Sequence, residues 1–158
     1  MPGLHVVPAD LDDPRVIALL EHHVATAQAE TARGSAHALD LPALKAPGIS
    51  AWAIWQGDDL MGLGALKWLS PDHGEVKSMH TAATARRRGV AAAMLTHLIA
   101  TARAERFSRL SLETGSWAYF DGARALYARH GFVECAPFAG YVPDPHSVFM
   151  TLDLTAAG

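Results

Sequence analysis

The stretch of sequence best suited to chemistry is VKSMHTAATARRRGVAAA, residues 76 to 93. Its pattern predicts a strand, a loop with three arginines, and a helix that opens at Gly89. A helix N-terminus presents unpaired backbone N–H groups and a positive dipole end, which together bind phosphate. The stretch contains neither the Gly-Lys-Ser/Thr of a Walker A loop nor the dinucleotide pattern GxGxxG. It therefore indicates a phosphate site of another type, and a solvated basic helix cap is the alternative.

Two segments together resemble the GNAT superfamily of acyl-CoA N-acyltransferases. Arg86 to Ala91, RRRGVA, is similar to that superfamily's pyrophosphate loop, Gln/Arg-x-x-Gly-x-Gly/Ala. Ala123 to Phe132, ARALYARHGF, resembles its second signature, A-x-x-L-Y-x-x-x-G-F. LETG at 112–115 and PDPHSVFM at 143–150 resemble a subgroup of small bacterial GNAT proteins. The chain departs from the superfamily at Phe120, where many members have an asparagine that contacts the cofactor arm.

The resemblance implies that acetyl-CoA is the acyl donor. Its pantetheine arm would enter between two parallel strands, at 75–81 and 107–114, and its pyrophosphate would lie on the amides of residues 87–92. Arg86 and Arg88 would add charge-assisted contacts, while Arg87 is less certain because successive loop residues point in different directions. The expected cofactor-binding residues are Met79, His80, Thr81, Arg86, Arg87, Arg88, Gly89, Val90, Ala91 and Ala92.

Acetyl transfer to an amine requires a proton acceptor, a polarised thioester carbonyl and a proton donor for the leaving thiolate. We expect Tyr127 to be the donor, because a phenol (pKa about 10) stays protonated where a thiol (about 8.5) ionises. Glu75, at the start of the cofactor strand, is the first candidate base and Glu113 the second, although either could belong to a structural ion pair. A water relay is the alternative proton acceptor. A backbone N–H near Met79 would polarise the carbonyl.

The acceptor side of the site is harder to read. Glu30, His37, Asp40 and Tyr141 are the candidates for binding a cationic amine, together with the loop at 138–146. Asp40 is also a plausible helix N-cap. The adjacent His22 and His23 face different directions on a helix, and no HxxxH spacing with a carboxylate occurs, so we expect no metal site.

Composition limits the class of protein. The chain has 158 residues, 50% of them hydrophobic and 18% charged, which excludes intrinsic disorder. A net charge of −3 and an acidic first half argue against nucleic-acid binding. No apolar run approaches the roughly 20 residues of a membrane span, so we expect a soluble cytoplasmic protein. Cys135 is the only cysteine, which leaves no intramolecular disulfide and little support for a cysteine intermediate.

Periodicity predicts one domain over residues 1–158, with the element order β-α-α-β-β-β-α-β-α-β-β. This is an α/β fold with a mixed sheet covered by helices on both faces, as the GNAT resemblance implies. Exposed edge strands leave a homodimer open. The predicted strands are 4–7, 49–55, 60–69, 75–81, 107–114, 132–135 and 147–154, and the predicted helices are 14–33, 40–44, 88–105 and 117–130.

The sequence thus predicts an N-acetyltransferase that moves acetyl from acetyl-CoA to a primary amine of a small molecule, by direct attack in a ternary complex. The alternative is a module that binds acyl-CoA as a regulatory ligand and does no chemistry. Phe120 in place of asparagine keeps that alternative open.

Overall fold

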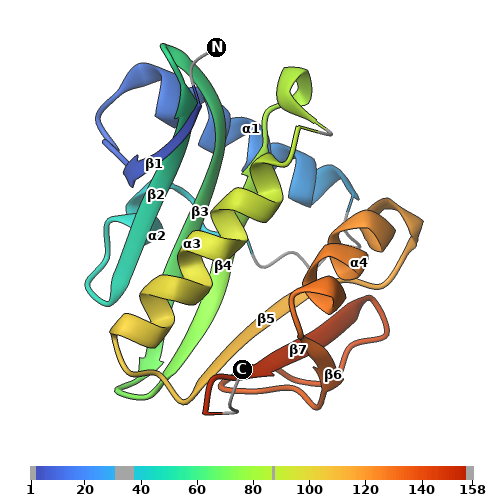
Figure 1. The fold of residues 1–158 in the computed structure, drawn as a ribbon. Helices are drawn as coiled ribbons and strands as arrows, with labels where there is room; N and C mark the ends of the chain where they lie inside the picture. Colours follow the sequence, from blue (N-terminus) through green and yellow to red (C-terminus); the bar gives the residue numbers. More distant parts are fainter. Residues whose placement is uncertain (1–2, 31–37, 87, 156–158) are drawn as a thin grey trace.

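The computed structural model describes residues 3–30, 38–86 and 88–155. The element order agrees with the sequence prediction (Figure 1). The strands are β1 Leu4–Pro8, β2 Ile49–Gln56, β3 Asp59–Ser70, β4 His73–Thr81, β5 Arg109–Gly115, β6 Val133–Cys135 and β7 Ser147–Asp153. The helices are α1 Pro14–Glu30, α2 Leu41–Leu44, α3 Val90–Ala104 and α4 Asp121–Arg129, with 3-10 turns at Ala83–Ala85 and Ala118–Phe120.

All seven strands form one mixed sheet in the order β1-β2-β3-β4-β5-β7-β6. Neighbouring strands are antiparallel except β4 and β5, which run parallel. This parallel pairing covers only three residues of each strand, from His73 to Glu75 and from Arg109 to Ser111. Figure 1 shows β4 and β5 meeting at one end and diverging toward the other. The sheet is therefore open in its middle, where the sequence predicts the cofactor arm.

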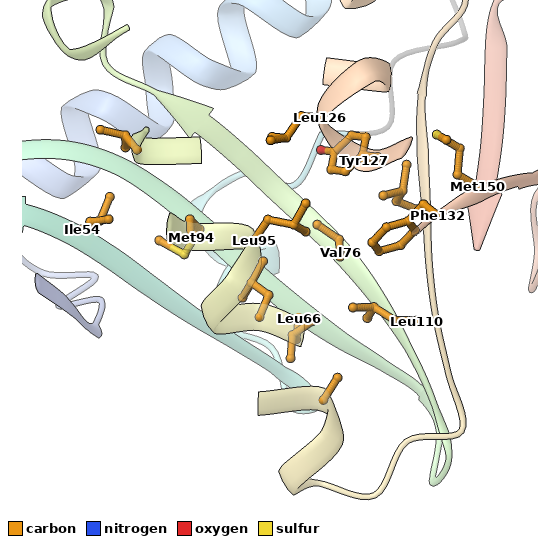
Figure 2. Packing of buried hydrophobic residues seen from close by; sticks show 14 of the residues in the cluster. Ile54, Leu66, Val76, Met94, Leu95, Leu110, Leu126, Tyr127, Phe132 and Met150 are labelled. Carbon is orange, nitrogen blue, oxygen red and sulfur yellow. The ribbon is translucent and has the colours of Figure 1, made fainter. Parts of the chain in front are cut away.

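Two apolar clusters cover opposite faces of the sheet. On one face α3 buries Met94, Leu95 and Leu98, at the helical spacing that the sequence predicts, and the cluster continues to Tyr127 of α4 (Figure 2). On the other face α1 and α2 form a smaller cluster around Leu20. The larger cluster includes residues of the diverging strands β4 and β5, whereas the smaller one packs against β2 and β3.

A bulge interrupts β4 where it faces the opening. Ser78 has a φ of 57°, in the left-handed region, and the register with β3 shifts at this point. Lys77 pairs with Ala65 and His80 pairs with Leu63, so Ser78 and Met79 have no partner residue in the described parts of β3 or β5. The alternation that the sequence predicts for this strand therefore ends at Lys77.

The last helix begins later than the sequence predicts. In place of one helix from Trp117 to His130, a 3-10 turn precedes α4, and the Phe120 N–H donates to the Trp117 carbonyl at 2.9 Å. Residues three apart eclipse in a 3-10 turn, and here the rings of Trp117 and Phe120 pack edge to face at 4.9 Å. This aromatic contact accounts for the tighter turn.

Within the described residues, no helix is long and apolar enough to span a membrane.

Candidate active site

Two cavities lie where β4 and β5 separate. The larger, about 580 Å³, adjoins the arginine loop and the start of α3, and we call it the loop cavity. The smaller, about 150 Å³, lies between the β4 bulge and the end of β5, and we call it the inner cavity. Both are lined by Met79, Phe120 and Tyr127, and by His23, Ala27 and Ala123. The two cavities therefore meet at these six residues.

The loop cavity contains most of the predicted cofactor-binding residues. Its walls include Met79, His80, Thr81, Arg86, Gly89, Val90, Ala91 and Ala92. Gly89 is the N-cap of α3 with a φ of 75°, a left-handed conformation that favours glycine, and no side chain caps the helix. Unpaired N–H groups of the first helical turn are thus available to a ligand, as predicted.

The three arginines do not share one role. Arg86 lines the loop cavity, whereas Arg88 lines a separate cleft with Arg15, Asp58 and Asp59. The structure therefore does not bring Arg88 to the predicted pyrophosphate site, because the left-handed turn at Gly89 follows it and the chain changes direction there. Arg87 lies outside the described residues.

Tyr127 is held at the junction of the cavities by the end of α4. The N–H of Gly131 donates to the Ala128 carbonyl at 3.0 Å, and the N–H of Phe132 to the Tyr127 carbonyl at 3.1 Å. With Gly131 at a φ of 96°, these two bonds form a Schellman motif. Its apolar contact is between the rings of Tyr127 and Phe132, 5.8 Å apart (Figure 2). The predicted Gly-Phe helix end thus fixes the predicted proton donor.

The Tyr127 hydroxyl is suited to donating a proton. The side chain is buried, yet its oxygen is accessible from the cavities and has no hydrogen-bond partner among the described residues. Burial raises the pKa of Tyr127 above its usual value, and the charge of Glu113 raises it further. The phenol therefore remains protonated at any physiological pH.

The two predicted bases occupy different surroundings. Glu113 lines the inner cavity, and its charge adds to the raised pKa of Tyr127. Glu75 is only 2% exposed and lines neither cavity. Its Oε2 accepts a hydrogen bond from the Tyr141 hydroxyl at 2.6 Å and pairs with Lys77 Nζ at 3.4 Å. Glu75 therefore belongs to an ion pair, the alternative that the sequence left open.

Asp40 and Tyr141, the two predicted acceptor-binding residues whose side chains the structure describes, are not brought together. Tyr141 packs against the pair, donating to Glu75 and accepting from Lys77 Nζ at 3.0 Å. Asp40 accepts a hydrogen bond from the Ala43 N–H at 3.0 Å and so is the N-cap of α2. Glu30 is the last residue of α1, and its side chain lies outside the described part, as does His37 altogether.

The structure adds site residues that sequence reasoning missed. The inner cavity is also lined by Lys77, Ser78 and Trp117, and by His146 at the end of the predicted acceptor loop. His23 lines both cavities, and a local signal for it existed. It follows buried Leu20 by three residues and precedes Ala27 by four, so it is a polar residue within the apolar stripe of α1.

His23 faces His80 across the junction. Their Nδ1 atoms are 3.1 Å apart, and the edge of the His22 ring contacts His80 at a centroid distance of 5.5 Å. Burial is the main cause that lowers the pKa of both His23 and His80 to about 4, and nearby positive charge, including Lys77 for His23, adds to it. Both imidazoles are therefore neutral near pH 7. No three His, Cys, Asp or Glu side chains of the described chain gather as a metal site.

Comparison with known proteins decides the family. The model of the acetyltransferase (GNAT) family matches residues 16–132. The chain belongs to the GNAT acetyltransferase family. The uncharacterized N-acetyltransferase YedL of Escherichia coli (strain K12) is 46% identical over 145 residues, which are 92% of this chain and 91% of YedL. The protein is thus an acetyl-CoA-dependent N-acetyltransferase.

Solved structures agree with the GNAT fold. A candidate acyl-CoA N-acyltransferase from Klebsiella pneumoniae subsp. pneumoniae MGH 78578 superposes with a TM-score of 0.77 at 30% identity, covering 96% of this chain and 97% of that one. A Bacillus subtilis acetyltransferase in complex with CoA has a TM-score of 0.68 at 15% identity, covering 96% and 99%. The mixed sheet predicted from the sequence is therefore the GNAT sheet.

Proposed function

We propose that this protein transfers the acetyl group of acetyl-CoA to a primary amine of a small molecule, by direct attack in a ternary complex. The observation that carries this proposal is that the loop cavity and the inner cavity meet at Tyr127. Two connected cavities allow donor and acceptor to be bound at once with their reacting atoms adjacent. The alternative, an acyl-CoA-binding regulatory module, does not require the inner cavity.

The loop cavity would hold the CoA portion of the donor. The first-turn amides of α3, with Arg86 beside them, would bind the pyrophosphate, and the edge of β4 from Met79 to Thr81 would bind the pantetheine arm. The CoA complex of the Bacillus subtilis acetyltransferase supports this assignment, since the two chains share the fold. Arg88 is left out of this part of the proposal because it lines another cleft.

The β4 bulge would polarise the thioester. Ser78 and Met79 have no partner residues in the described parts of the neighbouring strands, and both line the inner cavity. A backbone N–H at this point would donate to the carbonyl oxygen as negative charge develops on it. The left-handed conformation of Ser78 is the local distortion that takes the strand out of its ladder.

The reaction replaces the carbon–sulfur bond of the thioester with a carbon–nitrogen bond. The amine nitrogen bonds to the carbonyl carbon, the nitrogen loses one proton, the carbon–sulfur bond breaks, and the CoA sulfur gains one proton. Tyr127 would give that last proton, because its accessible hydroxyl lies where the two cavities meet. The phenolate is afterwards reprotonated from solvent, so the enzyme returns to its starting state.

The inner cavity favours a small acceptor. Its volume of about 150 Å³ is close to that of an engineered protein cavity that accepts benzene. Aromatic rings of Trp117 and Phe120 form part of its wall, and Glu113 supplies a carboxylate near Tyr127. A compact amine, attracted as a cation and attacking as the neutral base, fits these features.

An amine screen tests the proposal. Purified protein with acetyl-CoA is offered compact primary amines, bulky amines and amino-terminal peptides, and acetylated product is measured by mass spectrometry. We expect turnover with compact amines, intersecting initial-velocity lines, and a KM for the amine that rises at least tenfold in Glu113→Gln while the Kd for acetyl-CoA is unchanged. Saturable acetyl-CoA binding without acetylation of any amine would instead favour the regulatory module.

A further inference from the structure

The geometry leaves the role of proton acceptor open. Glu75 lies outside both cavities and is engaged by Lys77 and Tyr141. Glu113 lines only the inner cavity. The acceptor must reach the amine nitrogen while it is bonded to the acyl carbon, at the point where the cavities meet. Of the described side chains that line both cavities, only His23 and Tyr127 carry an acid–base group.

We propose that His23 is the general base of acetyl transfer and that His80 is the residue that positions it. Nδ1 of His23 faces Nδ1 of His80 at 3.1 Å, which leaves Nε2 for the substrate. Nε2 of His23 has no hydrogen-bond partner among the described residues and is open to the cavities. The proposal rests on acetyl transfer to an amine, and not on which amine is used.

The Nδ1–Nδ1 contact lets either ring donate, and we assign the donated proton to His23. When His23 carries its proton on Nδ1 and donates it to His80 Nδ1, His23 Nε2 has a free lone pair. Protonation at Nε2 then yields an imidazolium whose Nδ1–H already has an acceptor. His80 thus holds the tautomer and the ring orientation, as the partner of a catalytic histidine does.

The surroundings keep the His23 imidazole neutral, so that it can accept a proton. Burial and the charge of Lys77 lower its pKa to about 4, so the ring is neutral throughout the physiological range. The neighbouring His22 adds to this lowering, and Glu113 of β5 and Tyr127 of α4 line the inner cavity together with His23. A weak base suffices, because the nitrogen of the tetrahedral adduct is far more acidic than the free ammonium ion.

The proton balance closes with Tyr127. The nitrogen of the adduct gives its proton to His23 Nε2, the carbon–sulfur bond breaks, and the sulfur takes the proton of the Tyr127 hydroxyl. His23 is left with one proton more and Tyr127 with one fewer, and exchange with solvent restores both. One side chain accepts and another donates at the same junction, so neither must do both within a turnover.

Substitution of His23 tests the base. We expect His23→Gln to lower kcat about 100-fold with the Kd for acetyl-CoA changed less than threefold. The control is His5→Gln on β1, an exposed histidine outside both cavities, which should stay within threefold of the unsubstituted protein. In His23→Ala, added imidazole should restore turnover in proportion to its concentration, and His80→Gln should fall between His23→Gln and the control.

Equal turnover in the His23→Gln and His5→Gln variants would overturn the proposal. So would a loss that imidazole does not restore, because that is the result of a structural role.

A measurement that needs no amine completes the test. Two-bond ¹H–¹⁵N correlation spectra of histidine-labelled protein with CoA should show His23 neutral at pH 7, with Nδ1 protonated and Nε2 bare. The opposite tautomer would refute the assignment even if no acceptor were known. Failure of the unsubstituted protein to acetylate any amine would refute the proposed function instead, so the two failures are distinguishable.

Discussion

Removing the Tyr127 hydroxyl is the sharpest test of the proposed mechanism. Tyr127→Phe keeps the ring that packs against Phe132 and the backbone bonds that end α4. The hydroxyl has no partner among the described residues, so its loss leaves no orphaned group behind. We therefore expect the free energy of unfolding to change by less than about 1 kcal/mol, and the Kd for acetyl-CoA to stay within threefold.

Turnover should fall much further. A positioned general acid contributes roughly 10²- to 10⁴-fold, and the lower end applies here because a thiolate is a moderately good leaving group. A 100-fold loss of kcat corresponds to about 2.7 kcal/mol of transition-state stabilisation. The raised pKa of Tyr127 means that all of the protein carries the donor form at neutral pH, so the loss should not depend on pH between about 6 and 9.

The assay follows the acetylated amine by chromatography, since thiol reagents would also react with Cys135. Thr101→Val is the control, because it removes one hydroxyl, bonded to the His97 carbonyl at 2.9 Å, from a part of α3 outside both cavities. If Tyr127→Phe turns over within threefold of this control, the tyrosine is not the acid.

Three further predictions concern the helix start at Gly89, the buried Glu75–Lys77 pair and the two facing histidines. Gly89→Val should raise the Kd for acetyl-CoA at least tenfold, and Gly89→Ala should raise it less. The reason is that a side chain at a φ of 75° is strained by about 1–2 kcal/mol. Equal titration curves for the variants and the unsubstituted protein would contradict a phosphate site on α3. Lys77→Met should destabilise the protein by about 3–5 kcal/mol in denaturant unfolding, since it leaves Glu75 buried without its cation, and adding Glu75→Gln should recover most of the loss. The pKa of His23 and of His80 is about 4 in the folded protein and 6.5 in the unfolded chain, so the unfolded state binds more protons between pH 4 and pH 6.5. The free energy of unfolding should therefore rise with pH over this range. The rise should be steeper than in a variant with Gln at both positions.

Local patterns in the sequence determined the elements of the site. The strand–loop–helix order around Gly89, the helical spacing of α3 and the Gly-Phe end of α4 each depend on residues within a few positions of one another. Such signals reflect backbone conformation and helix periodicity, which a short segment decides for itself. They predicted the loop and helix start at Gly89 and the helix end beside Tyr127, and the structure has both.

Long-range packing decided which side chains meet. Glu75 and Lys77 lie two residues apart, yet their pairing with Tyr141 depends on a loop 64 residues further along the chain. His23 and His80 are 57 residues apart and meet because α1 packs against β3 and β4. A sequence pattern shows which face a residue is on, but contact between faces requires the register and crossing of whole elements. The sequence thus determined the loop before α3 and the place of Tyr127, while tertiary structure alone put Glu75 in an ion pair outside both cavities and brought His23 to their junction.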